Sequence, residues 1–230
     1  MIVANFAGLT VQINNKYDYT ARMCKDYLSD SKTYDFSVEV TDDEISSEGS
    51  GFDRGYLESL AIYRKIAEKL LDYDGFLMHG AVFDYLGDGI ALLAKSGVGK
   101  STHLRLWQML LKDKVKIING DKPLVRFVGD KPYAYGTAWA GKENLHTNDK
   151  TELKKICFIE RSAENECVPL SKGDVLERFV SQIYVPKSAD KLVKTLDLTD
   201  RLIKSTDFYL IRCNMNISAA ETAFEVVCLK

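Results

Sequence analysis

The chain has 230 residues, of which 46% are hydrophobic and 28% charged, a composition typical of a soluble globular protein. Its 31 lysines and arginines nearly balance its 33 aspartates and glutamates, for a formal net charge of −2. This balance argues against a general electrostatic grip on nucleic acid or on an anionic membrane surface. No apolar run reaches the roughly 18 residues of a membrane-spanning helix, and the first residues do not resemble a secretory signal. We therefore expect a cytoplasmic protein.

Cysteine and histidine usage gives no sign of a structural metal site. The five cysteines form no CxxC pair, and with only three histidines no zinc site can be assembled from residue spacing. Cys157 and Cys213 lie in apolar runs, which is typical of buried thiols in a reducing compartment. His103 and His146 are expected to be surface or packing residues.

The first residues of the chain predict a small β-containing unit. Its expected elements, in chain order, are a hairpin over 1–14, a helix over 18–29 and a strand over 34–40. The acidic, glycine-bearing stretch 41–53 is expected to be a loop. We place a boundary there, between an N-terminal appendage of residues 1–50 and a main domain of residues 51–230.

The rest of the chain alternates predicted helices and strands, which indicates helices layered on a mixed sheet in an α/β (α+β) fold. A helix is expected after Asp53, because Leu57, Leu60 and Tyr63 begin an apolar stripe at helical spacing. Strands are expected at 76–85, 89–94, 114–120, 153–160 and 207–213, with a hairpin over 124–136. Further helices are expected from residue 100, at 172–184, at 189–204, and from a capping box at 218–221.

The most informative segment is IALLAKSGVGKST, residues 90–102. An apolar strand leads into a glycine-rich turn, and a Lys-Ser-Thr sequence opens a helix, which is the context that a phosphate-binding loop requires. The turn glycines can aim backbone N–H groups into one concavity. Lys100 can reach the terminal phosphates of a nucleotide, and the Ser101 hydroxyl is placed to bind Mg²⁺. The expected nucleotide-binding residues are Lys95, Ser96, Gly97, Val98, Gly99, Lys100, Ser101 and Thr102.

A carboxylate on a neighbouring strand would complete such a site. The glycine that usually begins a phosphate-binding loop is Ala94 here, and alanine also tolerates a tight exit from a strand. The loop needs a carboxylate to share Mg²⁺ or to accept a proton. Asp121, directly after the apolar segment 114–120, is the candidate, and an ordinary turn aspartate is the alternative.

Three other features each have two interpretations. His79, expected inside a strand, is equally compatible with a packed core histidine and with a position beside the phosphates. In the loop 136–142, Trp139 and Lys142 suit the capture of an acceptor, but the tryptophan is at least as compatible with sealing a core edge. Arg161, at a strand end, fits a solvated turn residue better than a phosphate ligand.

Together these motifs resemble the kinase domain of HPr kinase/phosphorylase and its relatives, a superfamily that includes the ATP-dependent phosphoenolpyruvate carboxykinases. The motifs are His79-Gly80-Ala81, GIALLAKSGVGKST, a strand leading to Asp121, and YGTAWAGK, over about residues 76–145. The resemblance implies a mixed-sheet P-loop kinase core with ATP and Mg²⁺ as cofactors. By position, Lys100 would bind phosphate, Ser101 and Asp121 would hold the metal, and Asp121 would be the catalytic carboxylate with His79 beside it.

The resemblance therefore implies an ATP-dependent kinase that transfers the γ-phosphate to the serine-type hydroxyl of a peptide or protein. A kinase acting on a small molecule is one alternative. A non-catalytic nucleotide-binding regulatory protein is another, because the chain has Gly120-Asp121 where the family has two aspartates. Neither nucleic acid nor a membrane is expected as a partner, and a homo-oligomer is compatible with the sequence.

Overall fold

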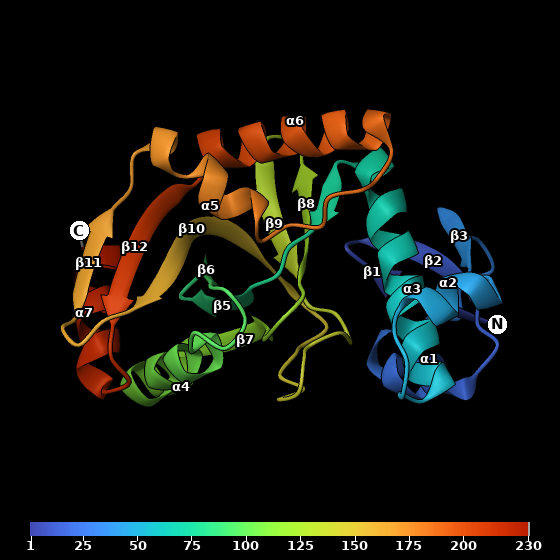
Figure 1. Ribbon diagram of the computed structural model, residues 1–230, viewed down its shortest axis with the longest axis horizontal. Coiled ribbons are helices and arrows are strands. Elements are labelled where there is room, and N and C mark those ends of the chain that lie inside the picture. Colours follow the sequence, from blue (N-terminus) through green and yellow to red (C-terminus); the bar gives the residue numbers. More distant parts are fainter. Residues whose placement is uncertain (230) are drawn as a thin grey trace.

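The computed structural model describes residues 1–229 and contains two sheets (Figure 1). The smaller sheet has the order β1-β2-β3. Strands β1 (Ile2–Phe6) and β2 (Leu9–Asn14) form the predicted antiparallel hairpin, and β3 (Phe36–Glu39) runs parallel to β2. The helix expected over 18–29 is shorter than predicted, since α1 (Asp18–Met23) ends before a separate 3-10 turn, η1 (Lys25–Tyr27).

The stretch 41–53 is not the loop that its composition predicts, because it contains the helix α2 (Asp42–Ser47). A capping box begins this helix. The Thr41 hydroxyl accepts a hydrogen bond from the Glu44 backbone N–H at 3.2 Å, and the Glu44 carboxylate accepts one from the Thr41 N–H at 2.8 Å. These reciprocal bonds satisfy N–H groups that a helix start leaves without a partner, which stabilises a helix in an acidic segment.

Helix α3 (Arg54–Leu70) starts where predicted, after Asp53, whose side chain accepts a hydrogen bond from the Tyr56 N–H at 3.0 Å. Its apolar stripe, including Leu57 and Tyr63, packs against the β1–β3 sheet in one hydrophobic cluster. Trp139, far along the chain, belongs to the same cluster. The helix thus connects the N-terminal sheet to the loop after β9, and the boundary at residue 50 stays a prediction.

The larger sheet has nine strands of mixed direction. They are β4 (Gly75–Leu77), β5 (Ala81–Tyr85), β6 (Asp88–Leu93), β7 (Val115–Asn119), β8 (Leu124–Val128), β9 (Lys131–Tyr135), β10 (Lys150–Arg161), β11 (Glu166–Pro169) and β12 (Asp207–Cys213). The start of β10 pairs antiparallel with β9, and its remainder pairs parallel with β6 and β12. Strand β5 pairs antiparallel with β6 and β7, so the order around the predicted loop is β7-β5-β6-β10-β12.

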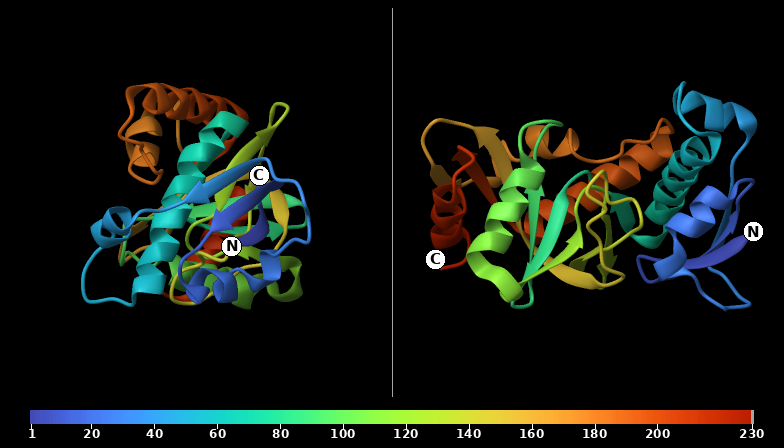
Figure 2. Two further views of the ribbon diagram at one scale, coloured as in Figure 1. Left: turned by 90° about the vertical axis from the view of Figure 1, so that its right-hand side faces the viewer. Right: turned by 90° about the horizontal axis from the view of Figure 1, so that it is seen from below.

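Helices cover both faces of this part of the sheet, which explains why β6 is apolar at successive positions. The helices are α4 (Lys100–Leu111), α5 (Leu176–Val180), α6 (Ala189–Ser205) and α7 (Ile217–Val227). Ala91 and Leu93 belong to the cluster with α5 and α6, while Ile90 and Leu92 belong to the cluster with α4 and α7. Figures 1 and 2 show α6 along one side of the sheet and α4 on the other. The predicted mixed α/β class is confirmed.

The prediction of one continuous strand over 76–85 is wrong, and the difference affects the site. It is two strands, β4 and β5, and His79 lies in the break between them instead of inside a strand. There the His79 N–H donates to the Gln182 carbonyl at 2.7 Å, and the Gly80 N–H donates to the Asp121 carbonyl at 2.8 Å. The break therefore exists because distant segments take over the hydrogen bonds of a strand.

Two C-terminal predictions are also wrong. The helix expected over 172–184 is only the 3-10 turn η4 (Lys172–Asp174) and the short α5. The expected capping box at 218–221 is absent, since α7 follows Asn216 with no side-chain cap. The Ser218 hydroxyl instead accepts a hydrogen bond from Asn165 at 2.9 Å. Cys157 and Cys213 are buried as predicted, and within residues 1–229 no helix is long and apolar enough to cross a membrane.

Candidate active site

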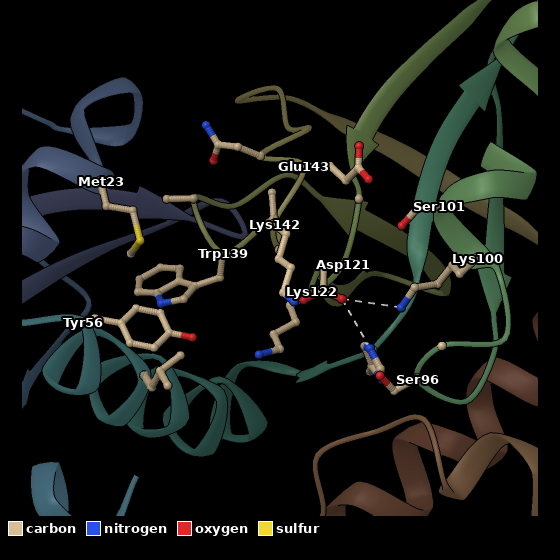
Figure 3. Close-up of a pocket in the computed structure, with 18 of the residues that line it drawn as sticks. Met23, Tyr56, Ser96, Lys100, Ser101, Asp121, Lys122, Trp139, Lys142 and Glu143 are labelled. Atoms are coloured by element: carbon tan, nitrogen blue, oxygen red, sulfur yellow. Dashed lines mark hydrogen bonds and ion pairs between the residues drawn. The ribbon is translucent and has the colours of Figure 1, made fainter. Parts of the chain in front are cut away.

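A cleft of about 880 Å³ contains most of the predicted site residues. Its lining comes from α1, α3, the loop before α4, the turn after β7 and the loop after β9, as Figure 3 shows in part. The volume is within the usual range for small-ligand sites. Of the eight predicted nucleotide-binding residues, seven line the cleft: Lys95, Ser96, Gly97, Gly99, Lys100, Ser101 and Thr102. Val98 is the exception and packs partly against the core cluster of α4 and α7.

The loop between β6 and α4 has the conformation that its glycines predict. Gly97 and Gly99 have φ angles of +79° and +126°, in the region that residues with a side chain rarely adopt. Helix α4 begins at Lys100, and no side chain caps its start. The N–H groups of its first turn are therefore available to an anion, which the helix dipole also favours.

Arg161 holds this loop in place. Its Nε donates to the Val98 carbonyl at 3.0 Å, and its Nη2 donates to the Gly97 carbonyl. Arg161 stands at the end of β10, the parallel neighbour of β6, so the sheet itself positions the guanidinium. Arg161 is exposed at a strand end, as expected, and in addition its two hydrogen bonds restrain the loop carbonyls.

Asp121 and Lys100 lie together in the cleft (Figure 3), and His79 lines the cleft as well. The Oδ1 atom of Asp121 is 3.3 Å from Nε2 of His79 and 3.5 Å from Nζ of Lys100. Within residues 1–229, no donor pairs with the other carboxylate oxygen, Oδ2. One oxygen of Asp121 is thus held by two side chains, and the second is available to a ligand.

Burial and the neighbouring charges shift the pKa of Asp121 in opposite directions. Burial alone would raise the pKa of Asp121, but the hydrogen bond from His79 and the charges of Lys100 and Lys122 outweigh it, so the pKa lies below its usual value. Burial lowers the pKa of Lys100, and the attraction of Asp121 only partly offsets this. Asp121 is therefore a carboxylate at neutral pH.

A buried asparagine fixes the turn that carries Asp121. The Oδ1 atom of Asn119 accepts hydrogen bonds from the Asp121 and Lys122 N–H groups at 2.9 and 2.7 Å. Its Nδ2 donates to the carbonyl and hydroxyl oxygens of Thr137, both at 3.0 Å. Tyr63 donates to the Lys122 carbonyl at 2.5 Å. Every polar atom of this fully buried asparagine is used, so the turn after β7 is rigid.

The loop after β9 forms another wall of the cleft. Trp139 is buried and stacks on Tyr63, with ring centroids 4.0 Å apart and planes 7° apart. Its Nε1 donates to the Ser59 carbonyl of α3 at 3.1 Å. Trp139 therefore seals a core edge, as one of its two interpretations predicts, and it also lines the cleft, while a role in capturing an acceptor stays a prediction. Lys142 is exposed and lines the cleft as well.

Sequence reasoning missed several cleft residues. Lys122 follows Asp121 directly, and Glu143 forms an ion pair with Arg105, one helical turn after Ser101 on α4. Four further residues come from the N-terminal helices: Tyr19, Met23, Tyr56 and Leu60. The position next to Asp121 was a usable signal for Lys122. The N-terminal residues gave none, because only the tertiary fold brings α1 and α3 to the cleft.

The residues present fit a magnesium ion bound together with a nucleotide. Mg²⁺ in phosphate sites takes one or two carboxylates, with phosphates and waters as its other ligands. Ser101 and Asp121 offer one hydroxyl and one carboxylate, and the Oδ2 atom of Asp121 has no competing donor within the described chain. No group of three or more His, Cys, Asp or Glu side chains suited to a metal occurs in residues 1–229, so the ion would depend on its nucleotide.

Comparisons with known proteins add a distant similarity. Among the solved structures that match is the Hpr(Ser) kinase/phosphatase from Coxiella burnetii, with 9% sequence identity and a TM-score of 0.31. The alignment covers 54% of this chain and 90% of that chain. No protein-family model and no curated protein matches the sequence. A similarity of this degree assigns neither a family nor a function.

Proposed function

We propose that this protein is an ATP-dependent kinase of the HPr kinase-like type, which transfers the γ-phosphate to a serine-type hydroxyl. One observation carries the proposal: an uncapped helix start with Lys100 lies beside a carboxylate, Asp121, whose second oxygen is free. The helix start and Lys100 suit an anionic phosphate, and the free oxygen of Asp121 suits the proton of an acceptor hydroxyl. Both line the same cleft, as phosphoryl transfer requires.

In this proposal each residue has a separate task. Lys100 and the N–H groups of the loop bind the terminal phosphates. Asp121 takes the proton of the acceptor hydroxyl, whose oxygen bonds to the γ-phosphorus as the bond to the β-phosphate oxygen breaks, leaving ADP. His79 keeps the carboxylate in position through Oδ1. Mg²⁺, held by Ser101 and Asp121, would supply neutralisation of phosphate charge. Positioning and charge would provide most of the rate.

A second cavity, of about 340 Å³, is suited to the nucleoside. It lies at the carboxyl ends of the parallel strands β10 and β12, beside the loop, where open α/β sheets bind ligands. His103 lines it and is buried, with Nδ1 accepting a hydrogen bond from Trp107 at 3.0 Å. The proton must then be on Nε2, which has no partner within residues 1–229. Nε2 is itself buried, so the position of the cavity beside the loop, and not this donor, is what suits it to a nucleoside.

ATP binding and ATP turnover, with and without Mg²⁺, test the proposal in wild type and two variants. Lys100→Ala is expected to abolish turnover, and Asp121→Asn to retain ATP binding while turnover falls by about a hundredfold or more. Lys114→Ala, an exposed lysine outside the cleft, is the control and should behave as wild type. Absence of nucleotide binding, or normal turnover in both site variants, would overturn the proposal.

A non-catalytic nucleotide-binding regulator is the second candidate. It is favoured by the single free carboxylate of the site, since the other acid in the cleft, Glu143, is paired with Arg105. Tight ATP binding without turnover, even in the presence of peptide and metabolite extracts, would support this function instead.

A further inference from the structure

The end of the cleft farther from the phosphate-binding loop is an apolar wall. Tyr19 and Met23 of α1 and Tyr56 and Leu60 of α3 form it, and all four are half-buried. The rings of Tyr19 and Tyr56 meet edge to face, with centroids 5.9 Å apart. Figure 3 shows Met23, Tyr56 and Trp139 grouped on the side opposite Lys100 and Ser101. An apolar surface in this place favours an apolar group of a ligand.

The apolar wall has a fixed geometry, because α1 and α3 are held against each other. The fully buried carboxylate of Glu58 accepts hydrogen bonds from the Lys16 and Tyr17 N–H groups, at 2.5 and 3.1 Å. At Gly55 the helices approach so closely that a Cβ would lie 2.7 Å from Cβ of Tyr19. The apolar side chains are thereby presented on a rigid support, which lowers the entropy cost of binding.

Two cations stand between this wall and Asp121. Lys122 and Lys142 both line the cleft, and Figure 3 shows their side chains between Tyr56 and Asp121. Within residues 1–229, neither ammonium group has a carboxylate partner or a hydrogen bond, whereas Lys100 is paired with Asp121. The rigid turn at Asn119 sets the backbone of Lys122. An anionic group of a ligand would satisfy these lysines.

We propose that the phosphate acceptor is a hydroxyl compound with a carboxylate or similar anionic group near the hydroxyl and an aromatic or other bulky apolar group beyond it. The inference rests on the proposed kinase function and names the substrate class of that site. It is supported by the order of the groups along the cleft, where the phosphate-binding loop is followed by Asp121, then by the two unpaired lysines and then by the apolar wall. A hydroxyl at Asp121 places the rest of such a molecule against the lysines and then the aromatic side chains.

Four small probes test the class with the full chain, ATP and Mg²⁺, by measuring phosphorylated product and ADP. The dipeptide Ser-Phe has all three groups, Ser-Phe amide lacks the carboxylate, and Ser-Gly lacks the apolar group. We expect kcat/KM for Ser-Phe to exceed that for each of the other two dipeptides by about tenfold or more. Phenyllactate combines the three groups in a small acid, so comparing it with Ser-Phe distinguishes a metabolite from a peptide as the source.

Variants connect each preference to its residue. Tyr56→Ala should remove the preference for Ser-Phe over Ser-Gly, and Lys122→Met should remove the preference for the free carboxylate over the amide. Tyr34→Ala and Lys114→Met change exposed residues outside the cleft and should keep both preferences. A preference that survives its variant overturns the assignment.

The two proposals fail in different ways. If ATP is turned over in a Lys100-dependent manner but neither Ser-Phe nor phenyllactate is phosphorylated, or the three dipeptides react equally, the acceptor class is wrong. If Lys122→Met weakens ATP binding and leaves the acceptor preference unchanged, Lys122 binds the nucleotide, and the proposed acceptor class is again wrong. If ATP does not bind at all, the kinase function itself fails.

Discussion

The side chain of Asn119 fixes the backbone at Asp121, because its Oδ1 atom accepts a hydrogen bond from the Asp121 N–H at 2.9 Å. The same oxygen accepts a hydrogen bond from the Lys122 N–H, so one buried group fixes the backbone from which both the carboxylate and the adjacent ammonium extend. If Asp121 is the base of the proposed reaction, it needs this kind of support, since small errors in position cost large factors in rate. The geometry of the cleft therefore depends on a residue that is not part of its lining.

Asn119→Ala should destabilise the protein by about 3 kcal/mol, because it leaves buried backbone groups without partners. ATP turnover should fall further than the loss of folded protein explains, since the Asp121 turn is no longer fixed. Urea unfolding and turnover under folding conditions measure the two effects. Asn148→Ala is the control, because Asn148 is exposed and makes one hydrogen bond, to Asp26. Equal effects of the two variants would contradict the positioning role.

Gly141→Ala tests how closely the next loop approaches Asp121. Gly141 has a φ of +73°, and a Cβ there would lie 2.9 Å from Cβ of Asp121. Gly129 has a similar φ of +61° but open space around it, so Gly129→Ala carries the backbone cost alone, about 1 kcal/mol. We expect turnover to fall about tenfold or more only for Gly141→Ala. Similar turnover in the two variants would show that the contact with Asp121 is unimportant.

Arg161→Ala should weaken ATP binding by about tenfold, or 1.4 kcal/mol, because the loop carbonyls of Gly97 and Val98 lose their donors. Global stability should change little, since the side chain is exposed. Isothermal titration with ATP measures the affinity. Arg212→Ala, which removes exposed ion pairs with Glu160 and Glu166, is the matched control and should leave affinity unchanged.

The part of the site that could be predicted is the part that local sequence determines. Strand β6, the loop and α4 are continuous over residues 90–102, and the apolar run, the glycines and the helix start each carry a local signal. The helix α2 was also readable, because Thr41 and Glu44 have the spacing of a capping box, although the acidic composition suggested a loop.

What could not be predicted depends on contacts between distant segments. The break at Met78–Gly80 arises because their N–H groups donate to Pro123, Gln182 and Asp121. No local pattern distinguishes such a break from a continuous strand. The apolar wall has the same origin, since α1 and α3 reach the cleft only through their packing on the N-terminal sheet and Trp139. Tertiary structure overrides local propensity in both cases.

The burial of His103 leads us to expect that the stability of the fold depends on pH in the acid range. Burial lowers its pKa from the usual 6.5 to about 4, so the folded protein keeps it neutral. Between these values the unfolded chain binds a proton that the folded chain does not, and stability therefore falls as the pH drops through this window. The shift corresponds to a loss of about 3 kcal/mol by pH 4, after which the contribution of this group levels off.

Urea unfolding at a series of pH values from 7 to 4 measures this loss. His103→Gln keeps an acceptor for the Trp107 indole N–H but cannot titrate, so its stability should fall less between pH 7 and 4, by about 3 kcal/mol. His146→Gln is the control, because His146 is half-buried and bonds to the Tyr27 hydroxyl at 2.9 Å. If wild type and His103→Gln lose stability in parallel, His103 is not held neutral by burial.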